Sequence, residues 1–205
     1  EFPAPKNLNK LMKAAAAESG LEYSGQQEQA IAQAATSGVL LITGGPGTGK
    51  TTIVNGILSL LGHMQLKCVL AAPTGRAAKR LTEVTGEEAS TIHRLLEAGI
   101  DPNTGRMVFS RDADQPLKAD AIIVDELSMV DLPLMHALLC ALRPNTRIVL
   151  VGDADQLPSV GPGNVFGDLI RSGRVETVAL TEIFRQAQQS AIIRTAHAVN
   201  EGILP

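Results

Sequence analysis

The sequence predicts an α/β fold in which a doubly wound, mostly parallel sheet carries helices on both faces. Five short apolar runs occur at 39–42, 68–71, 121–124, 148–151 and 175–180, and helix-like segments separate most of them. Runs that are continuously apolar indicate strands buried on both faces, which is typical of parallel sheets. Ligands of such folds collect at the carboxyl ends of the strands, so functional residues are expected there.

Residues 1–35 are expected to form a helical segment ahead of the sheet domain, which occupies 36–205. Ala-rich and Gln-rich stretches favour two helices, and Ser24 is a candidate N-cap for the second. Residues 99–118 interrupt the alternation of strands and helices. Asn103-Thr104-Gly105 is placed to turn a small hairpin there, so this segment is interpreted as a surface insertion.

Composition favours an ordinary globular protein, with 44% hydrophobic and 19% charged residues in 205. No apolar run is long enough to span a bilayer and no secretory signal is visible, so a cytoplasmic protein without a membrane partner is expected. The net charge of -3 gives no overall attraction to nucleic acid, so any such contact must be local. Cys68 and Cys140 lie in apolar stretches and are predicted to be reduced core thiols.

The clearest functional signal is a glycine-rich phosphate loop, which fits the pattern G-x-x-x-x-G-K-[ST] between a predicted strand and a helix-compatible stretch. Glycines let backbone N–H groups turn toward phosphate oxygens, and a helix N-terminus adds partial positive charge. Lys50 is expected to reach the β and γ phosphates of ATP, and Thr51 to offer its hydroxyl to Mg²⁺. The candidate nucleotide-binding residues of the loop are Gly45, Pro46, Gly47, Thr48, Gly49, Lys50 and Thr51.

Two carboxylates, Asp125 and Glu126, directly follow the apolar run 121–124. A phosphate-loop hydrolase needs a carboxylate near its metal ion and a group that orients the attacking water. Asp125 is expected to hold Mg²⁺ through its water shell, and Glu126 to position or deprotonate water. Such a pair alone is as often a helix N-cap. Its combination with the phosphate loop favours the catalytic interpretation.

Two further polar residues are candidates for contacts with the terminal phosphate. Gln156 follows another apolar run and can donate to the γ-phosphate while accepting from water, although a plain polar loop residue is the alternative. Arg185 is a candidate for stabilising charge in the transition state, because its planar fork matches phosphate oxygens. Taken alone, an arginine in a loop is usually a surface residue.

These blocks together resemble the superfamily 1 DNA helicases, and within them the RecD/TraA-like group, over about residues 22–202. The resemblance implies a RecA-like P-loop NTPase domain, the first motor domain (1A). It also implies that Gln27 of a Q motif reads adenine, with Gln26 as the alternate. The family's motifs I, Ia, II, III and IV correspond in order to Gly44–Thr52, Ala72–Ala78, Asp125–Asp131, Gly152–Gly163 and Leu180–Gln186, and a further family block matches Ser90–Leu96. Motif I adds Thr52 to the candidate nucleotide-binding residues.

By the same resemblance, single-stranded DNA is expected to contact seven residues. A loop of small residues after a strand can offer N–H and hydroxyl groups to phosphates, which supports the first four. His93 is equally explained as a satisfied histidine in a helix packed on the sheet, and Arg76 as a solvated charge. The seven residues are Pro73, Thr74, Gly75, Arg76, Thr91, His93 and Ser159.

The resemblance implies an ATP-dependent DNA helicase that moves 5'-to-3' on single-stranded DNA in recombination or repair. Family helicases hydrolyse ATP between two RecA-like domains, and motifs V and VI of the second are not found in this sequence. The chain is therefore expected to be a domain 1A fragment that partners a second RecA-like domain of the same protein. The alternatives are the alpha subunit of exodeoxyribonuclease V, with the other subunits as partners, and a regulatory ATP-binding module without motor activity.

Overall fold

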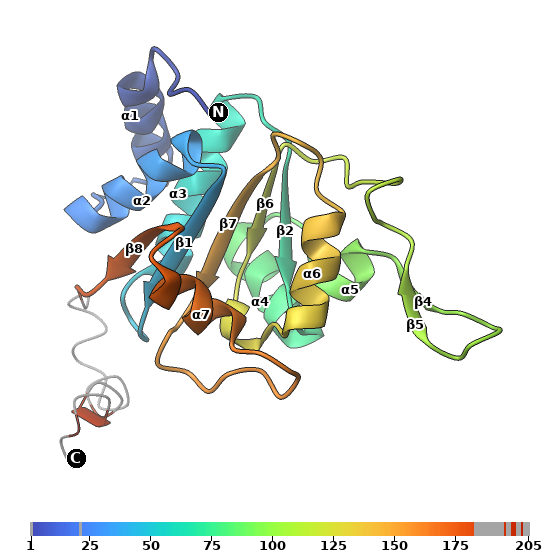
Figure 1. The fold of residues 1–205 in the computed structure, drawn as a ribbon. Helices are drawn as coiled ribbons and strands as arrows, with labels where there is room; N and C mark the ends of the chain where they lie inside the picture. The colour runs from blue at the N-terminus through green and yellow to red at the C-terminus, as the bar shows by residue number, and fades with distance from the viewer. Residues whose placement is uncertain (1, 21, 183–194, 196–197, 200–201, 203–205) are drawn as a thin grey trace.

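A computed structural model describes residues 2–20, 22–182, 195, 198–199 and 202 of the chain. Its centre is a parallel six-stranded sheet with the order β3-β2-β6-β7-β1-β8 (Figure 1). The predicted doubly wound α/β fold is thereby confirmed, since the sheet has helices on both faces. The strands are β1 (Val39–Gly44), β2 (Cys68–Ala72), β3 (Ala89–Thr91), β6 (Ala121–Val124), β7 (Arg147–Gly152) and β8 (Glu176–Leu180).

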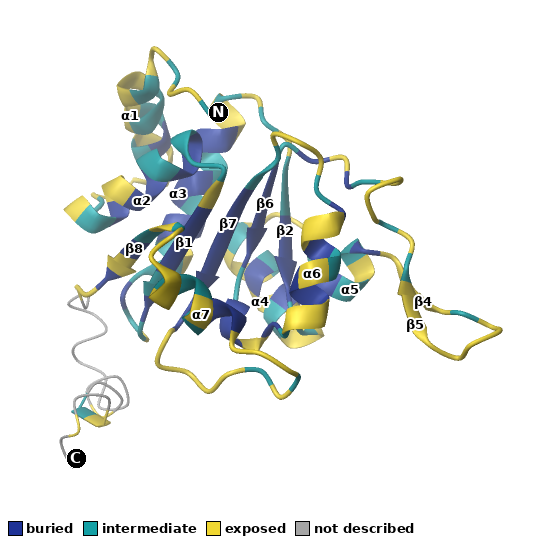
Figure 2. Ribbon diagram, in the orientation of Figure 1, coloured by how far each residue is buried: buried dark blue, intermediate teal, exposed yellow. Residues whose placement is uncertain are grey.

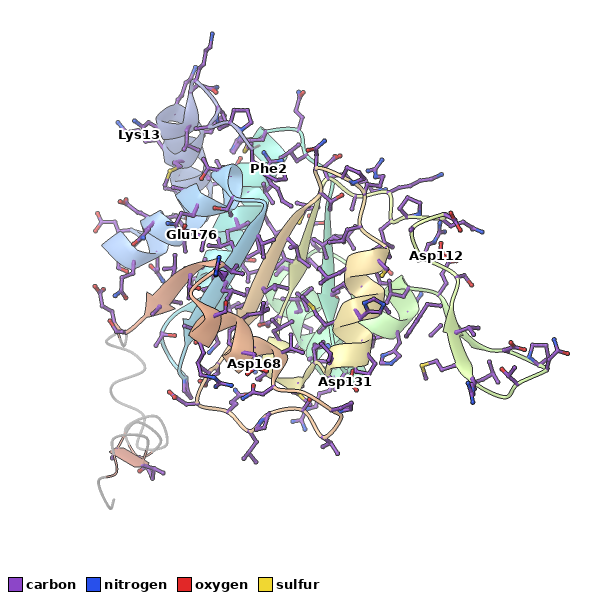
Figure 3. All side chains as sticks on the ribbon, viewed as in Figure 1. Phe2, Lys13, Asp112, Asp131, Asp168 and Glu176 are labelled. Atoms are coloured by element: carbon purple, nitrogen blue, oxygen red, sulfur yellow. The ribbon has the colours of Figure 1, made fainter. Side chains whose placement is uncertain are left out.

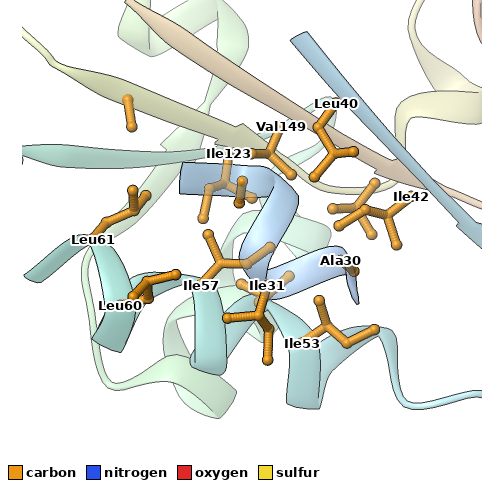
Figure 4. Packing of buried hydrophobic residues seen from close by; sticks show 14 of the residues in the cluster. Ala30, Ile31, Leu40, Ile42, Ile53, Ile57, Leu60, Leu61, Ile123 and Val149 are labelled. Atoms are coloured by element: carbon orange, nitrogen blue, oxygen red, sulfur yellow. The ribbon is translucent and has the colours of Figure 1, made fainter. Parts of the chain in front are cut away.

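The inner strands β1, β2, β6 and β7 are covered on both faces because successive side chains enter two separate cores. In β1, Leu40 and Ile42 point into one core and Leu41 into the other, and all three are 0% exposed. Figure 2 shows the strands as the buried centre of the molecule, and Figure 4 shows the packing of Ile31, Ile53 and Ile57 against the first face. Burial of each such side chain contributes about 1.5–3 kcal/mol, which explains the continuous apolar runs.

The helices that cover the first face come from the N-terminal part of the chain, and those that cover the second face come from later in the chain. The first core takes side chains from α1 (Leu8–Ser19), α2 (Gly25–Thr36), α3 (Lys50–His63) and α4 (Gly75–Thr85). The second takes them from α5 (Ile92–Leu95), the 3-10 helix η1 (Leu127–Met129), α6 (Leu132–Cys140) and α7 (Val165–Ser172). The predicted helices of the N-terminal segment are therefore packed into the same core as the sheet.

Local chemistry explains where α2 begins. Ser24 is extended and accepts a hydrogen bond from the Gln27 backbone N–H, while the Gln27 side chain accepts one from the Ser24 N–H at 3.0 Å. This reciprocal pair is a capping box, so the predicted N-cap is confirmed. The helix then packs along β8, where the Gln33 Nε2 donates to Glu176 at 2.7 Å.

The segment 99–118 contains the predicted hairpin. Strands β4 (Ala98–Ile100) and β5 (Met107–Phe109) pair antiparallel and extend away from the main sheet (Figure 1). The Asp101 side chain accepts hydrogen bonds from the N–H groups of Asn103 and Thr104, and Gly105 adopts a φ of +65°. These features close the turn, because glycine adopts positive φ without steric cost.

The two cysteines differ in environment. Cys68 begins β2 and is partly buried, whereas Cys140 at the end of α6 is exposed beside His136. The prediction of two core thiols was therefore wrong for Cys140, because the outer side of α6 faces solvent although its sequence is apolar. None of the described helices is long and apolar enough to cross a membrane.

Candidate nucleotide-binding site

The phosphate loop connects β1 to α3 at the carboxyl edge of the sheet. β1 ends at Gly44 and α3 begins at Lys50, as the motif predicts. Gly47 and Gly49 have φ of +79° and +83°, which side chains rarely tolerate. A Cβ on Gly44 would lie 2.5 Å from Thr48 Oγ1 and 3.0 Å from Leu180 Cβ. The glycines are thus required by backbone conformation and by close packing.

Lys50 lies inside this loop. Its Nζ donates to the backbone carbonyls of Gly44 and Gly45, the latter at 3.1 Å. Burial lowers the pKa of Lys50, whereas the negative charges of Asp153, Asp125 and Glu126 oppose that shift. An anion next to Nζ would offset the cost of burying the positive charge of Lys50. A β or γ phosphate would supply such an anion.

Asp125 and Glu126 directly follow β6. In the sheet β6 lies next to β7, which lies next to β1, the strand that leads into the phosphate loop. The Asp125 N–H donates to the carbonyl of Ala71 at 3.0 Å, and its Oδ1 accepts from the Glu126 N–H at 2.9 Å. Burial raises the pKa of both carboxyl groups, and the charge of Asp125 raises that of Glu126 further. A divalent cation would relieve this cost, so the pair fits a metal ligand and its neighbouring base.

Glu126 has a left-handed backbone conformation, with φ of +55° and ψ of +42°. This conformation costs a residue with a side chain about 1–2 kcal/mol. It turns Glu126 away from the direction of the strand and starts η1 immediately afterwards. The expectation that Glu126 points differently from Asp125 therefore has a backbone cause, and such strain clusters at functional sites.

Gln156 is in the loop after β7, next to the segment that follows Glu126. Its Oε1 accepts from Ser128 Oγ at 3.2 Å, and its N–H donates to the Asp153 carbonyl at 3.3 Å. The same loop is attached to β1, because the Ala154 N–H donates to Thr43 Oγ1 at 3.3 Å. Loops from β1, β6 and β7 thus converge at one edge of the sheet.

The two glutamines of the predicted Q motif have different surroundings. Gln27 is 2% exposed and its Oε1 is engaged in the capping box. Gln26 uses both ends of its amide on Thr181: Oε1 accepts from the backbone N–H at 3.0 Å and Nε2 donates to Oγ1 at 2.9 Å. Adenine recognition by Gln27 stays a prediction, and with Oε1 engaged its Nε2 is the group left to donate to a base.

The first group of predicted DNA contacts lies at the carboxyl ends of β2 and β3. Thr74 caps α4 by accepting from the Ala77 N–H at 3.2 Å, and Gly75 and Arg76 are exposed. Thr91 pairs in register with Ala72 and caps α5. Pro73 directly follows Ala72, so residues 73–76 and Thr91 lie next to each other. A single DNA strand that contacts both would need such a continuous surface.

The remaining two predicted DNA contacts are engaged within the chain. His93 lies in α5 with its ring 6.0 Å from that of Phe109 in β5. Ser159 Oγ lies 3.2 Å from the carbonyl oxygens of both Gly161 and Gly163, so its one proton is donated within the loop. These contacts neither establish nor contradict DNA binding.

Comparison with known proteins decides the family. A family model described as an AAA domain matches residues 27–162. The chain is 41% identical over 182 residues to the ATP-dependent RecD2 DNA helicase of Deinococcus radiodurans, covering 89% of the chain and 24% of the relative. It is 40% identical over 202 residues to the RecBCD enzyme subunit RecD of Mycobacterium tuberculosis H37Rv, covering 86% of the chain and 34% of the relative. The chain belongs to the RecD-like helicases of superfamily 1.

A solved structure supports the fold of this RecD-like domain. The Pif1 helicase from Candida albicans matches with a TM-score of 0.66 and 26% identity, over 90% of the chain and 45% of the Pif1 chain. The predicted RecA-like P-loop fold is thereby confirmed. The chain spans about a quarter to a third of the length of the RecD-type relatives above.

Two charged residues of the RecD-like site escaped the sequence interpretation. Asp153 is 3% exposed, and of the carboxylates it has the largest effect in raising the pKa of Lys50. The signal for it was present, because it directly follows a buried strand as Asp125 does. Arg80 on α4 lowers the pKa of Asp125 and Glu126. Nothing in its local sequence indicated this, since only the fold brings α4 near the carboxylates. Arg185 lies outside the described residues.

Proposed function

We propose that the protein containing this chain is an ATP-dependent DNA helicase of recombination or repair, and that this chain is its first motor domain. The observation that carries the proposal is the convergence of Lys50, Asp125, Glu126 and Gln156 at one edge of the sheet. A cation in a glycine loop, two partly buried carboxylates and an amide are the groups that phosphoryl transfer to water requires. The protein acts in the cytoplasm, where bacterial relatives would meet DNA.

Each residue has a role that follows from its chemistry. The backbone N–H groups of the loop Gly45–Thr52, apart from Pro46, which has none and shapes the loop, bind phosphates together with the Nζ of Lys50. Thr51 and Asp125 would hold Mg²⁺, which when bound neutralises phosphate charge. Glu126 takes the proton of the attacking water, and its raised pKa suits a general base. Arg185 stabilises charge on the transferring phosphoryl group. Gln27 contacts the adenine.

Single-stranded DNA binds across the ends of β2 and β3 and reaches the loop after β7. Thr74 and Gly75 at the start of α4 present a helix N-terminus, which favours phosphate, and Arg76 adds local positive charge to a chain of net charge -3. Pro73, Thr91, His93 and Ser159 complete the contact surface. Movement is 5'-to-3', and a second RecA-like domain closes over ATP and reopens after hydrolysis.

A second candidate is the alpha subunit of exodeoxyribonuclease V, in which this motor serves a nuclease on another subunit. The observation that favours it is the 40% identity to the protein named RecBCD enzyme subunit RecD. Capture of nuclease subunits with the intact protein from its native host would support this candidate, whereas a motor active without them supports a stand-alone helicase.

The test is ATP hydrolysis with and without single-stranded DNA, measured on the intact protein and on this chain alone. We expect strong stimulation by DNA in the intact protein and little turnover by the isolated chain. If the intact protein hydrolyses ATP at the same rate with and without single-stranded DNA, the result would contradict the motor proposal and favour a regulatory ATP-binding module instead.

A further inference from the structure

Ser128 and Gln156 join two catalytic segments by a side-chain hydrogen bond. The Ser128 hydroxyl, two residues after Glu126, lies 3.2 Å from Gln156 Oε1 in the loop after β7. Ser128 is only 7% exposed and belongs to η1, the 3-10 turn that the left-handed Glu126 initiates. The fold therefore restricts the position of the Ser128 side chain, which has little freedom to move in solvent.

This hydrogen bond fixes the orientation of the Gln156 amide. A glutamine amide has one acceptor oxygen and one donor nitrogen, and a serine hydroxyl has a single proton to donate. Because Ser128 donates to Oε1, the amide oxygen is turned toward Ser128, and the Nε2 donor is turned to a different side, where it can reach a ligand. A phosphate oxygen is a pure acceptor, whereas an attacking water must donate its proton to an acceptor. The arrangement therefore presents a donor, which suits a phosphate oxygen.

We propose that Ser128 is a positioning residue that sets the Gln156 amide as a donor to the terminal phosphate of ATP. The proposal rests on the proposed ATP site and goes further, because it assigns Gln156 to sensing the phosphate and leaves orientation of water to Glu126. The sequence allowed Gln156 both roles.

The loop backbone around Gln156 is held by other contacts, so Ser128 controls mainly the amide. Ala154 is bound to Thr43 on the side of β1. On the far side, the Leu132 N–H donates to the Pro162 carbonyl at 2.9 Å. A Cβ on Gly161 would collide with the carboxylate of Asp131, so the loop packs tightly on the start of α6, where Figure 3 labels Asp131. Removal of the Ser128 hydroxyl should leave these contacts in place.

A donor aimed at the terminal phosphate contributes to binding of a triphosphate but not of ADP. The test is the affinity of the intact protein for ADP and for a non-hydrolysable ATP analogue, both with Mg²⁺, by calorimetry. For Ser128→Ala we expect the preference for the analogue over ADP to fall about tenfold, with ADP affinity unchanged. One hydrogen bond to a charged group is worth about 1.5 kcal/mol or more, which corresponds to that factor.

Matched variants separate positioning from folding. Ser128→Thr keeps the hydroxyl and should retain the preference. Gln156→Ala should lose it to the same extent, and the double variant with Ser128→Ala should lose no more, since both act through one contact. If Ser128→Ala does not fold, Ser128→Cys, with its weaker donor, should show a smaller loss in the same direction.

Three results would overturn the proposal: an unchanged preference in Ser128→Ala, an equal loss of ADP and analogue affinity, or additive losses in the double variant. Failure of the helicase proposal is recognised separately, because it appears as wild-type ATP hydrolysis without DNA stimulation. That outcome leaves the binding measurements interpretable.

Discussion

The side-chain amide of Gln26 holds Thr181 with two hydrogen bonds, across 155 residues of sequence. Thr181 directly follows β8, whose last residue, Leu180, pairs in register with Gly44 at the start of the phosphate loop. This contact attaches the first turn of α2 to the edge strand beside the nucleotide site. It is an anchor for β8, which hydrogen-bonds to β1 on one side within the described sheet.

Replacement of Gln26 by Ala should lower the free energy of unfolding by about 1 kcal/mol, because both hydrogen bonds are lost at a partly exposed position. The melting temperature should fall by roughly 2–4 °C for a chain of this size, which thermal unfolding followed by circular dichroism would measure. Gln29→Ala, an exposed glutamine on the same helix, is the control and should melt as the wild type does. Equal melting of the two variants would mean that the Thr181 contact contributes nothing.

Lys50→Ala should abolish DNA-stimulated ATP hydrolysis in the intact protein. Loss of a single donor that stabilises transition-state charge costs about 100-fold or more in turnover. A steady-state phosphate-release assay with single-stranded DNA measures it, and Lys10→Ala, an exposed lysine of α1, should leave the rate unchanged. Unwinding that persists in Lys50→Ala would refute the assignment of the phosphate loop as the motor's ATP site.

Asp125→Asn should raise the melting temperature of the nucleotide-free protein at neutral pH. Burial raises the pKa of Asp125, so its ionised form is disfavoured in the folded state, and the stability contributed by this group falls as the pH rises above its unfolded value of about 3.9. Asn keeps an oxygen for the Glu126 N–H and carries no charge. Melting in EDTA at pH 7 would show the gain. Excess Mg²⁺ and nucleotide should favour the wild type instead, and an Asn variant that melts lower in EDTA would contradict the pKa argument.

The sequence predicted those features that repeat locally. Continuous apolar runs located the inner strands β1, β2, β6 and β7, because a strand buried on both faces is apolar at nearly every position. The run that located the edge strand β8 is partly polar and only partly buried. The three-residue strand β3 was not predicted, since Ala89-Ser90-Thr91 has no apolar run and is a strand only through pairing with β2. Asp125 and Glu126 were found because they directly follow the run that forms β6, and Gln156 because it lies in the loop after β7.

What the sequence did not supply are relationships that depend on packing between distant segments. Arg80 acts on the carboxylates only because α4 is placed near them, and the Ser128 contact to Gln156 requires the loops after β6 and β7 to meet. The exposure of Cys140 is another case. An apolar helix shows which residues are hydrophobic but not which of its sides the neighbouring elements leave open.

The two cysteines should react with a thiol reagent at very different rates. Burial raises the pKa of the Cys68 thiol to about 12, so almost no thiolate is present at pH 8, while Cys140 is exposed. Titration of the native protein with an aromatic disulfide reagent should give one fast thiol, and denaturant should release the second. The variant Cys140→Ser should lose the fast reaction. Two fast thiols in the native protein would contradict the burial of Cys68.

Glu126→Gln should preserve nucleotide binding and eliminate turnover. Gln has the same shape, so the left-handed backbone and the hydrogen bond from its N–H to Asp125 persist, while the base that accepts the water's proton is gone. Calorimetry with Mg²⁺ and ATP should give an affinity equal to or higher than that of the wild type, because the variant no longer places a second carboxylate near the phosphates. Single-turnover hydrolysis should slow by about 100-fold or more.

The control for Glu126→Gln is Glu83→Gln, which removes an exposed carboxylate of α4 and should change neither measurement. A pH profile adds a readout that a structural role would not move. Because burial and the charge of Asp125 raise the pKa of Glu126, wild-type turnover should decline as the pH falls through that raised value, when the base becomes protonated. The residual turnover of Glu126→Gln should lack this decline. Loss of ATP binding in Glu126→Gln would instead show that the carboxylate supports the structure of the site and is not its general base.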